Sequence, residues 1–90
     1  MMGAGTVADA KLAIEAFIAA ITEARNLAAR GVVGAKMDEL LLHAKELLDI
    51  VDESLSELNA RKYRDLFEAA PILRAKLEAL RDELRGGKAH

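Results

Sequence analysis

The sequence predicts an all-α protein, an up-down-up bundle of three helices that is counted as four if Pro71 breaks the last one. Three observations support this prediction. Apolar residues recur three and four positions apart in three successive stretches of about 24 residues, each about 36 Å long as a helix. The composition is 52% hydrophobic and 31% charged, with a single proline and no cysteine, which is typical of long helices. Similar helix lengths favour a bundle.

The first helix is expected to begin at Thr6 and to run to about Arg30. Thr6 and Asp9 have the spacing of a capping box, which satisfies free amides at a helix start. The glycine at Gly31 can take the left-handed conformation that ends a helix. One face gathers the apolar residues of this stretch, which are Val7, Ala10, Ile14, Phe17, Ile21, Ala24 and Ala28, with Ile18 and Leu27 widening it.

The second helix is expected to begin near Ala35, with Asp38 and Glu39 in its first turn, where carboxylates favour the helix dipole. Its apolar seam consists of Met37, Leu41, Ala44, Leu48, Val51, Leu55 and Leu58. The phase of the apolar pattern slips by one residue after Leu58. The slip predicts a turn around Asn59 and Ala60, and one continuous helix through this point is the alternative.

The third helix is expected from about Arg61 to Arg85. Its seam consists of Tyr63, Leu66, Ala70, Leu73, Leu77, Leu80 and Leu84. Pro71 lies inside it and removes one backbone hydrogen bond, so the helix must either kink there or end and start afresh. The seam keeps its phase across Pro71, which favours a kink. Residues 1–90 are expected to form one domain, with flexible ends at 1–5 and 86–90.

No catalytic, metal or cofactor site is expected, so the chain is predicted not to be an enzyme. The absence of cysteine excludes a disulfide framework and thiolate chemistry. His43 has Glu39 and Glu46 on its helical side, but a di-iron bundle needs a second Glu-x-x-His on another helix, and none is present. Ser54 and Ser56 have no paired base and are interpreted as polar surface positions. A small helical enzyme with a site at a dimer interface is the alternative from another class.

Charge is divided unevenly along the chain. Residues 35–58 carry two basic and seven acidic side chains, whereas residues 59–90 carry eight basic and five acidic ones. The second and third helices are therefore expected to be complementary neighbours, either within one subunit or across an interface between subunits. A regulatory nucleic-acid-binding protein that uses the basic last helix is a further alternative. Its basic residues would be Arg61, Lys62 and Arg64 around Tyr63, with Arg74, Lys76, Arg81 and Arg85 further along the helix. Carboxylates interrupt this basic surface, so nucleic acid is not the expected partner.

Four aliphatic residues lie off the seams and would be exposed in a monomer: Leu12, Leu42, Ile50 and Ile72. Exposed apolar patches mark interaction surfaces, so these residues are the candidate interaction site. The expected function is a helical protein–protein interaction or assembly module with coiled-coil-like packing. The favoured partner is a second copy in a dimer, or another helical protein. An export-chaperone-like adaptor that binds an amphipathic client helix is the alternative.

A cytoplasmic location is expected from the start of the sequence and from its hydropathy pattern. The first residues lack the basic region of a signal peptide. No uninterrupted apolar run approaches the roughly 20 residues of a transmembrane helix, so no membrane role is expected.

Overall fold

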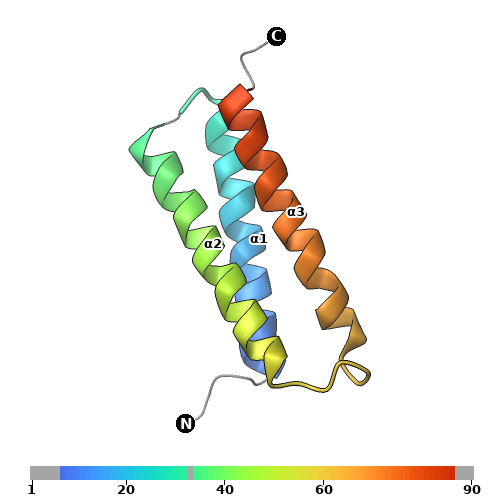
Figure 1. Ribbon diagram of the computed structural model, residues 1–90. Helices are drawn as coiled ribbons and strands as arrows, with labels where there is room; N and C mark the ends of the chain where they lie inside the picture. The colour runs from blue at the N-terminus through green and yellow to red at the C-terminus, as the bar shows by residue number, and fades with distance from the viewer. Residues whose placement is uncertain (1–6, 33, 87–90) are drawn as a thin grey trace.

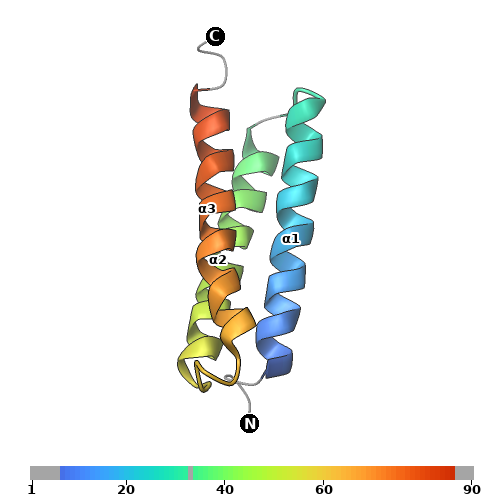
Figure 2. The ribbon, with the colours of Figure 1, turned by 90° about the vertical axis from the view of Figure 1, so that its right-hand side faces the viewer.

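The computed structural model describes residues 7–32 and 34–86, which form three helices: α1 (Val7–Ala29), α2 (Ala35–Ser56) and α3 (Arg64–Gly86) (Figure 1). This part of the chain contains no strand. The helices are 23, 22 and 23 residues long. Helices α1 and α3 run in the same direction and α2 runs in the opposite one, as the rotated view also shows (Figure 2). The prediction of an all-α, up-down-up bundle of three helices of similar length is confirmed.

The buried side chains of the three helices form one cluster. Helix α1 packs most extensively against α2, and α3 contacts both to a lesser degree. Phe17 is fully buried. Ile18 was expected to widen the buried face of α1, but it is 48% exposed, because it lies about 100° around the helix from Phe17. The cluster consists of Ala10, Ala13, Phe17, Ala20, Ile21, Ala24, Leu27, Met37, Ala44, Leu47, Leu48, Val51, Leu55, Ala70, Leu73, Leu77 and Leu80.

The connection from α1 to α2 depends on a glycine in the left-handed region. Gly31 has a φ of 78°. Its amide donates to the Ala28 carbonyl at 3.0 Å, and the Val32 amide donates to the Leu27 carbonyl at 2.8 Å. This pair of hydrogen bonds is a Schellman motif, which satisfies carbonyls at the end of a helix. The predicted helix end at Gly31 is confirmed, whereas Thr6, the predicted cap at the other end, lies outside the described residues.

A turn separates α2 from α3, so the alternative of one continuous helix is wrong. The turn centres on Asn59, whose Oδ1 atom accepts hydrogen bonds from the Arg61 amide at 2.9 Å and the Lys62 amide at 3.1 Å. The Tyr63 amide donates to the Asn59 carbonyl at 3.0 Å. These bonds close a turn over residues 60–63, and α3 begins at Arg64 rather than at Arg61.

Helix α3 continues through Pro71, so the alternative in which Pro71 splits it into two helices is wrong. Pro71 is an exposed residue in its interior. A proline has no amide hydrogen, so the Phe67 carbonyl loses the hydrogen bond that the residue four positions on would donate. Gly86 is the last residue of α3. The remaining predicted flexible residues, 1–5 and 87–90, lie outside the described part of the chain.

Candidate interaction groove

A groove of about 500 Å³ runs between α1 and α2. Its lining comes from Asp9, Leu12, Ala13 and Ala16 of α1 and from Leu47, Ile50, Glu53 and Ser54 of α2. None of the lining residues belongs to α3. We call this surface the α1/α2 groove.

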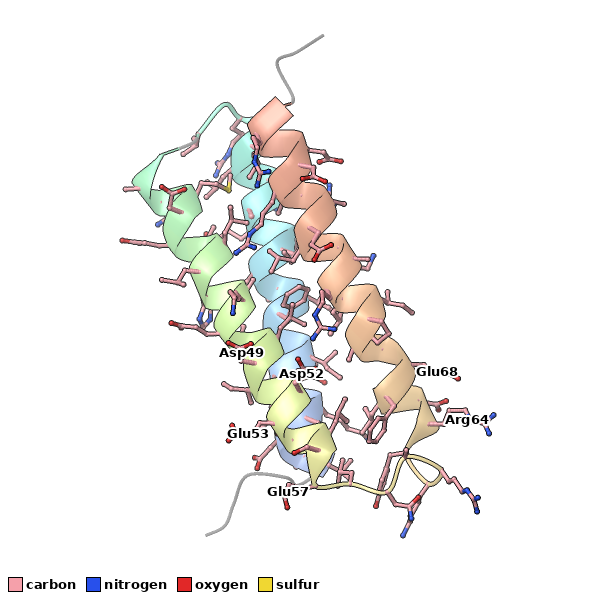
Figure 3. The ribbon with its side chains drawn as sticks, viewed as in Figure 1. Asp49, Asp52, Glu53, Glu57, Arg64 and Glu68 are labelled. Carbon is pink, nitrogen blue, oxygen red and sulfur yellow. The ribbon has the colours of Figure 1, made fainter. Side chains whose placement is uncertain are left out.

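The α1/α2 groove opens on the face of the bundle opposite α3. Arg25 of α1 and Asp52 of α2 mark the sides that face α3, because they form ion pairs with Glu83 and Arg74. Leu12 lies about 140° around α1 from Arg25, and Ile50 lies about 160° around α2 from Asp52. Figure 3 shows the same division on α2, where Asp52 projects toward α3 and the neighbouring Glu53 projects away from it. The groove is therefore not covered by α3.

The floor of the groove is buried and its two walls are exposed. Ala13 and Leu47 belong to the hydrophobic core and form the floor. Leu12 on one wall is 64% exposed and Ile50 on the other is 44% exposed. Ala13 and Ala16 have small side chains and leave room on the α1 side. Because the distance between packed helices depends on side-chain size at the contact, small residues here allow a close approach to α1. The groove thus has an apolar floor and an exposed aliphatic side chain on each wall.

The structure brings together two of the four predicted interaction residues. Leu12 and Ile50 line the same groove from opposite walls. Leu42 is exposed on α2 but lies about 80° around that helix from Ile50 and does not line the groove. Ile72 is exposed on α3, which contributes nothing to the groove. The four side chains therefore do not form one patch.

Sequence reasoning missed the contribution of Ser54. It was interpreted as a surface residue, but it is 1% exposed and lines the groove. Ser54 follows Leu47 by seven residues, which places both on the same side of α2. Leu47 was also left out of the predicted seam and is buried. The seven-residue spacing was the signal that could have identified both positions. The other serine, Ser56, is exposed as expected and its Oγ donates to the Glu53 carbonyl.

The rim of the groove is acidic. Asp9 and Glu53 line it, and no lysine or arginine does. Glu39, Glu46 and Glu53 are seven residues apart and all lie within about 60° of Ile50 around α2, and Glu57 continues this side. All four glutamates are exposed, and none of them forms an ion pair with another described residue. The negative charge on this side of α2 is therefore not neutralised within residues 7–32 and 34–86.

The possible metal motif on α2 does not gather ligands. Glu39, His43 and Glu46 are all exposed. Throughout the described ranges, no group of three or more histidine or carboxylate side chains is arranged to hold a metal ion.

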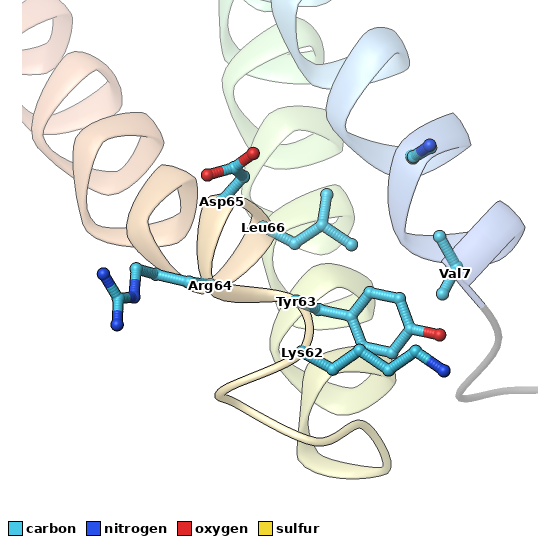
Figure 4. Close-up of a pocket in the computed structure, with 7 residues that line it drawn as sticks. Val7, Lys62, Tyr63, Arg64, Asp65 and Leu66 are labelled. Atoms are coloured by element: carbon cyan, nitrogen blue, oxygen red, sulfur yellow. The ribbon is translucent and has the colours of Figure 1, made fainter.

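The basic residues near the start of α3 do not converge on one point. Figure 4 shows the Lys62 side chain lying along the Tyr63 ring, while Arg64 points away from both. The Lys62 Nζ atom is 5.6 Å from the ring centroid, a distance at which a cation–π interaction forms. These residues line a pocket of about 260 Å³ together with Val7, Lys11, Asp65 and Leu66.

Helix α3 itself carries no excess of positive charge. Its basic residues are Arg64, Arg74, Lys76, Arg81 and Arg85, and its acidic residues are Asp65, Glu68, Glu78, Asp82 and Glu83. The positive excess of residues 59–90 comes instead from three residues that are not part of the sequence of α3, which are Arg61, Lys62 and Lys88. Among the described residues, one ion pair, Arg74 with Asp52, links α2 to α3. The predicted charge complementarity between the two helices is therefore limited to this contact.

A membrane-spanning helix needs both sufficient length and sufficient hydropathy, and none of the three described helices has both.

Comparison with known proteins finds no relative: no family model, no curated protein and no solved structure matches this chain.

Proposed function

We propose that this chain is a non-enzymatic helical interaction module that binds one amphipathic helix of another chain in the α1/α2 groove. The observation that carries this proposal is the position of Leu12 and Ile50, which are exposed on opposite walls above a buried apolar floor. Grooves of this kind bind the apolar face of a helix through residues spaced three and four positions apart. The bound helix would lie on the face opposite α3.

Burial of the two wall residues provides a driving force for this association. Fully burying a leucine or isoleucine contributes about 1.5–3 kcal/mol, so covering the exposed part of Leu12 contributes about 1–2 kcal/mol and that of Ile50 about 0.7–1.3 kcal/mol. The helix can come from a second copy, which forms a dimer, or from another protein. An export-chaperone-like adaptor would use the same groove for a client helix.

The test is sedimentation equilibrium of the full chain, alone and with an 18-residue amphipathic peptide that has a leucine seam and uncharged glutamine flanks. We expect the wild-type chain to associate, with itself or with the peptide. The double variant Leu12→Ser/Ile50→Ser should associate at least tenfold more weakly, because it removes both apolar walls. Circular dichroism of the variant should retain the helical signal, since both residues are exposed.

The matched control is Leu42→Ser/Ile72→Ser, which removes two equally exposed aliphatic residues outside the groove. This control should associate as the wild-type chain does. The proposal is wrong if the wild-type chain remains a monomer that binds no amphipathic peptide with this leucine seam, whatever the charge of its flanks, or if both double variants lose association to the same extent.

A further inference from the structure

We infer that the α1/α2 groove selects a cationic amphipathic helix of a different protein, with an apolar seam flanked by lysine or arginine. This inference rests on the proposed function and adds the chemistry of the partner. Its basis is the charge of the groove rim rather than its apolar floor.

The rim presents carboxylates on both walls. Asp9 lies on the α1 wall and Glu53 on the α2 wall. Glu46 and Glu57 extend the acidic side of α2 in both directions from Glu53, and neither forms an ion pair with another described residue. A helix seated on Leu12 and Ile50 would place its flanking residues beside these carboxylates. Flanking lysine or arginine would therefore be attracted and flanking glutamate repelled.

A second copy of this chain fits the rim poorly. A symmetric dimer places the same patch of each subunit against the other, so two α1/α2 grooves would bring Glu53 and its acidic neighbours together. Helix α3 of a second copy offers as many acidic as basic residues, so it has no net charge to complement the rim. Like charges at an interface act against association, and the favoured occupant is accordingly a helix of opposite charge.

The experiment compares two 18-residue peptides with the same leucine seam, one with lysine flanks and one with glutamate flanks. Each carries one tryptophan, and because the chain has none, tryptophan emission reports binding of the peptide alone. The lysine peptide should bind the full wild-type chain about tenfold more tightly at 50 mM salt, the combined effect of several exposed ion pairs. This ratio should shrink at 500 mM salt, where exposed charges are screened.

Two charge-reversal variants localise the effect. The variant Glu46→Lys/Glu53→Lys should bring the affinity ratio of the lysine to the glutamate peptide to one or reverse it. The control Glu68→Lys changes an exposed residue of α3 (Figure 3) and should leave this ratio near tenfold. Equal binding of both peptides by the wild-type chain overturns the inference, yet leaves the proposed groove intact. A shift in the ratio with Glu68→Lys also overturns it, because the preference would then follow net charge.

The remaining outcomes separate the inference from the proposed function. A dimer of the chain that excludes both peptides and dissociates in Leu12→Ser/Ile50→Ser overturns the inference, because the occupant is then a second copy, while the groove remains the binding site. Failure of the lysine, glutamate and glutamine peptides to bind, with no dimer, overturns both proposals.

Discussion

Replacement of Phe17 by alanine tests whether the buried cluster holds the three helices together. Phe17 is fully buried and is among the largest such side chains in the described structure. Truncating a buried phenylalanine to alanine costs about 3–5 kcal/mol, because apolar contacts are lost and a cavity remains. A domain of 90 residues has a free energy of unfolding of about 5–13 kcal/mol, so Phe17→Ala removes a large part of it. The midpoint of thermal unfolding should fall by about 12–40 °C.

The assay is urea and thermal unfolding followed by circular dichroism, with Ile18→Ala as the matched control. Ile18 is the next residue along α1 but is 48% exposed, so its truncation should change the free energy of unfolding by less than about 1 kcal/mol. A loss below about 1 kcal/mol for Phe17→Ala, or equal losses for both variants, would refute the packing of α1 described above.

Four further variants at three positions test the turns and the proline, each by urea unfolding. Gly31→Ala should lower the free energy of unfolding by about 1–2 kcal/mol, because alanine is strained at a φ of 78°; an unchanged value would contradict the Schellman end of α1. Asn59→Ala should cost about 1 kcal/mol through loss of its side-chain hydrogen bonds, and Asn59→Asp should restore most of it; equal losses in both variants would argue against the acceptor role of Oδ1. Pro71→Ala should stabilise the chain by about 1–3 kcal/mol, since it supplies the missing amide inside α3. Destabilisation by Pro71→Ala would show that the proline is required for the packing of α3.

The sequence allowed prediction of the helices because their apolar spacing is a local property. A seam of three and four residue steps specifies a buried face within one helix, and Gly31 identifies the end of α1 through its own backbone freedom. The start of α3 was less predictable. The Oδ1 atom of Asn59 accepts hydrogen bonds from the Arg61 and Lys62 amides and closes one turn ahead of α3, and such side-chain bonds to the backbone leave no mark in the apolar pattern.

The groove could be predicted in part. Helical spacing indicated correctly that Leu12 and Ile50 are exposed. Their convergence depends on which flank of α1 faces which flank of α2, and on which side of this pair α3 packs. Spacing within one helix contains neither piece of information, so Leu42 and Ile72 were grouped with the other two although they lie outside the groove.

Charge counts along the chain gave an incomplete account of the electrostatics because they do not show which carboxylates of α2 face α3. Two carboxylates of α2 are engaged, because Asp49 pairs with Lys45 on the same helix and Asp52 pairs with Arg74 of α3. The glutamates on the groove side form no ion pair within the described residues. The acidity of α2 is therefore partly neutralised where the helix meets α3 and is retained beside Ile50. Because the retained charge borders the exposed apolar walls, a partner that covers Leu12 and Ile50 must also meet the carboxylates, and this coupling favours a cationic helix over a neutral one of equal apolar surface.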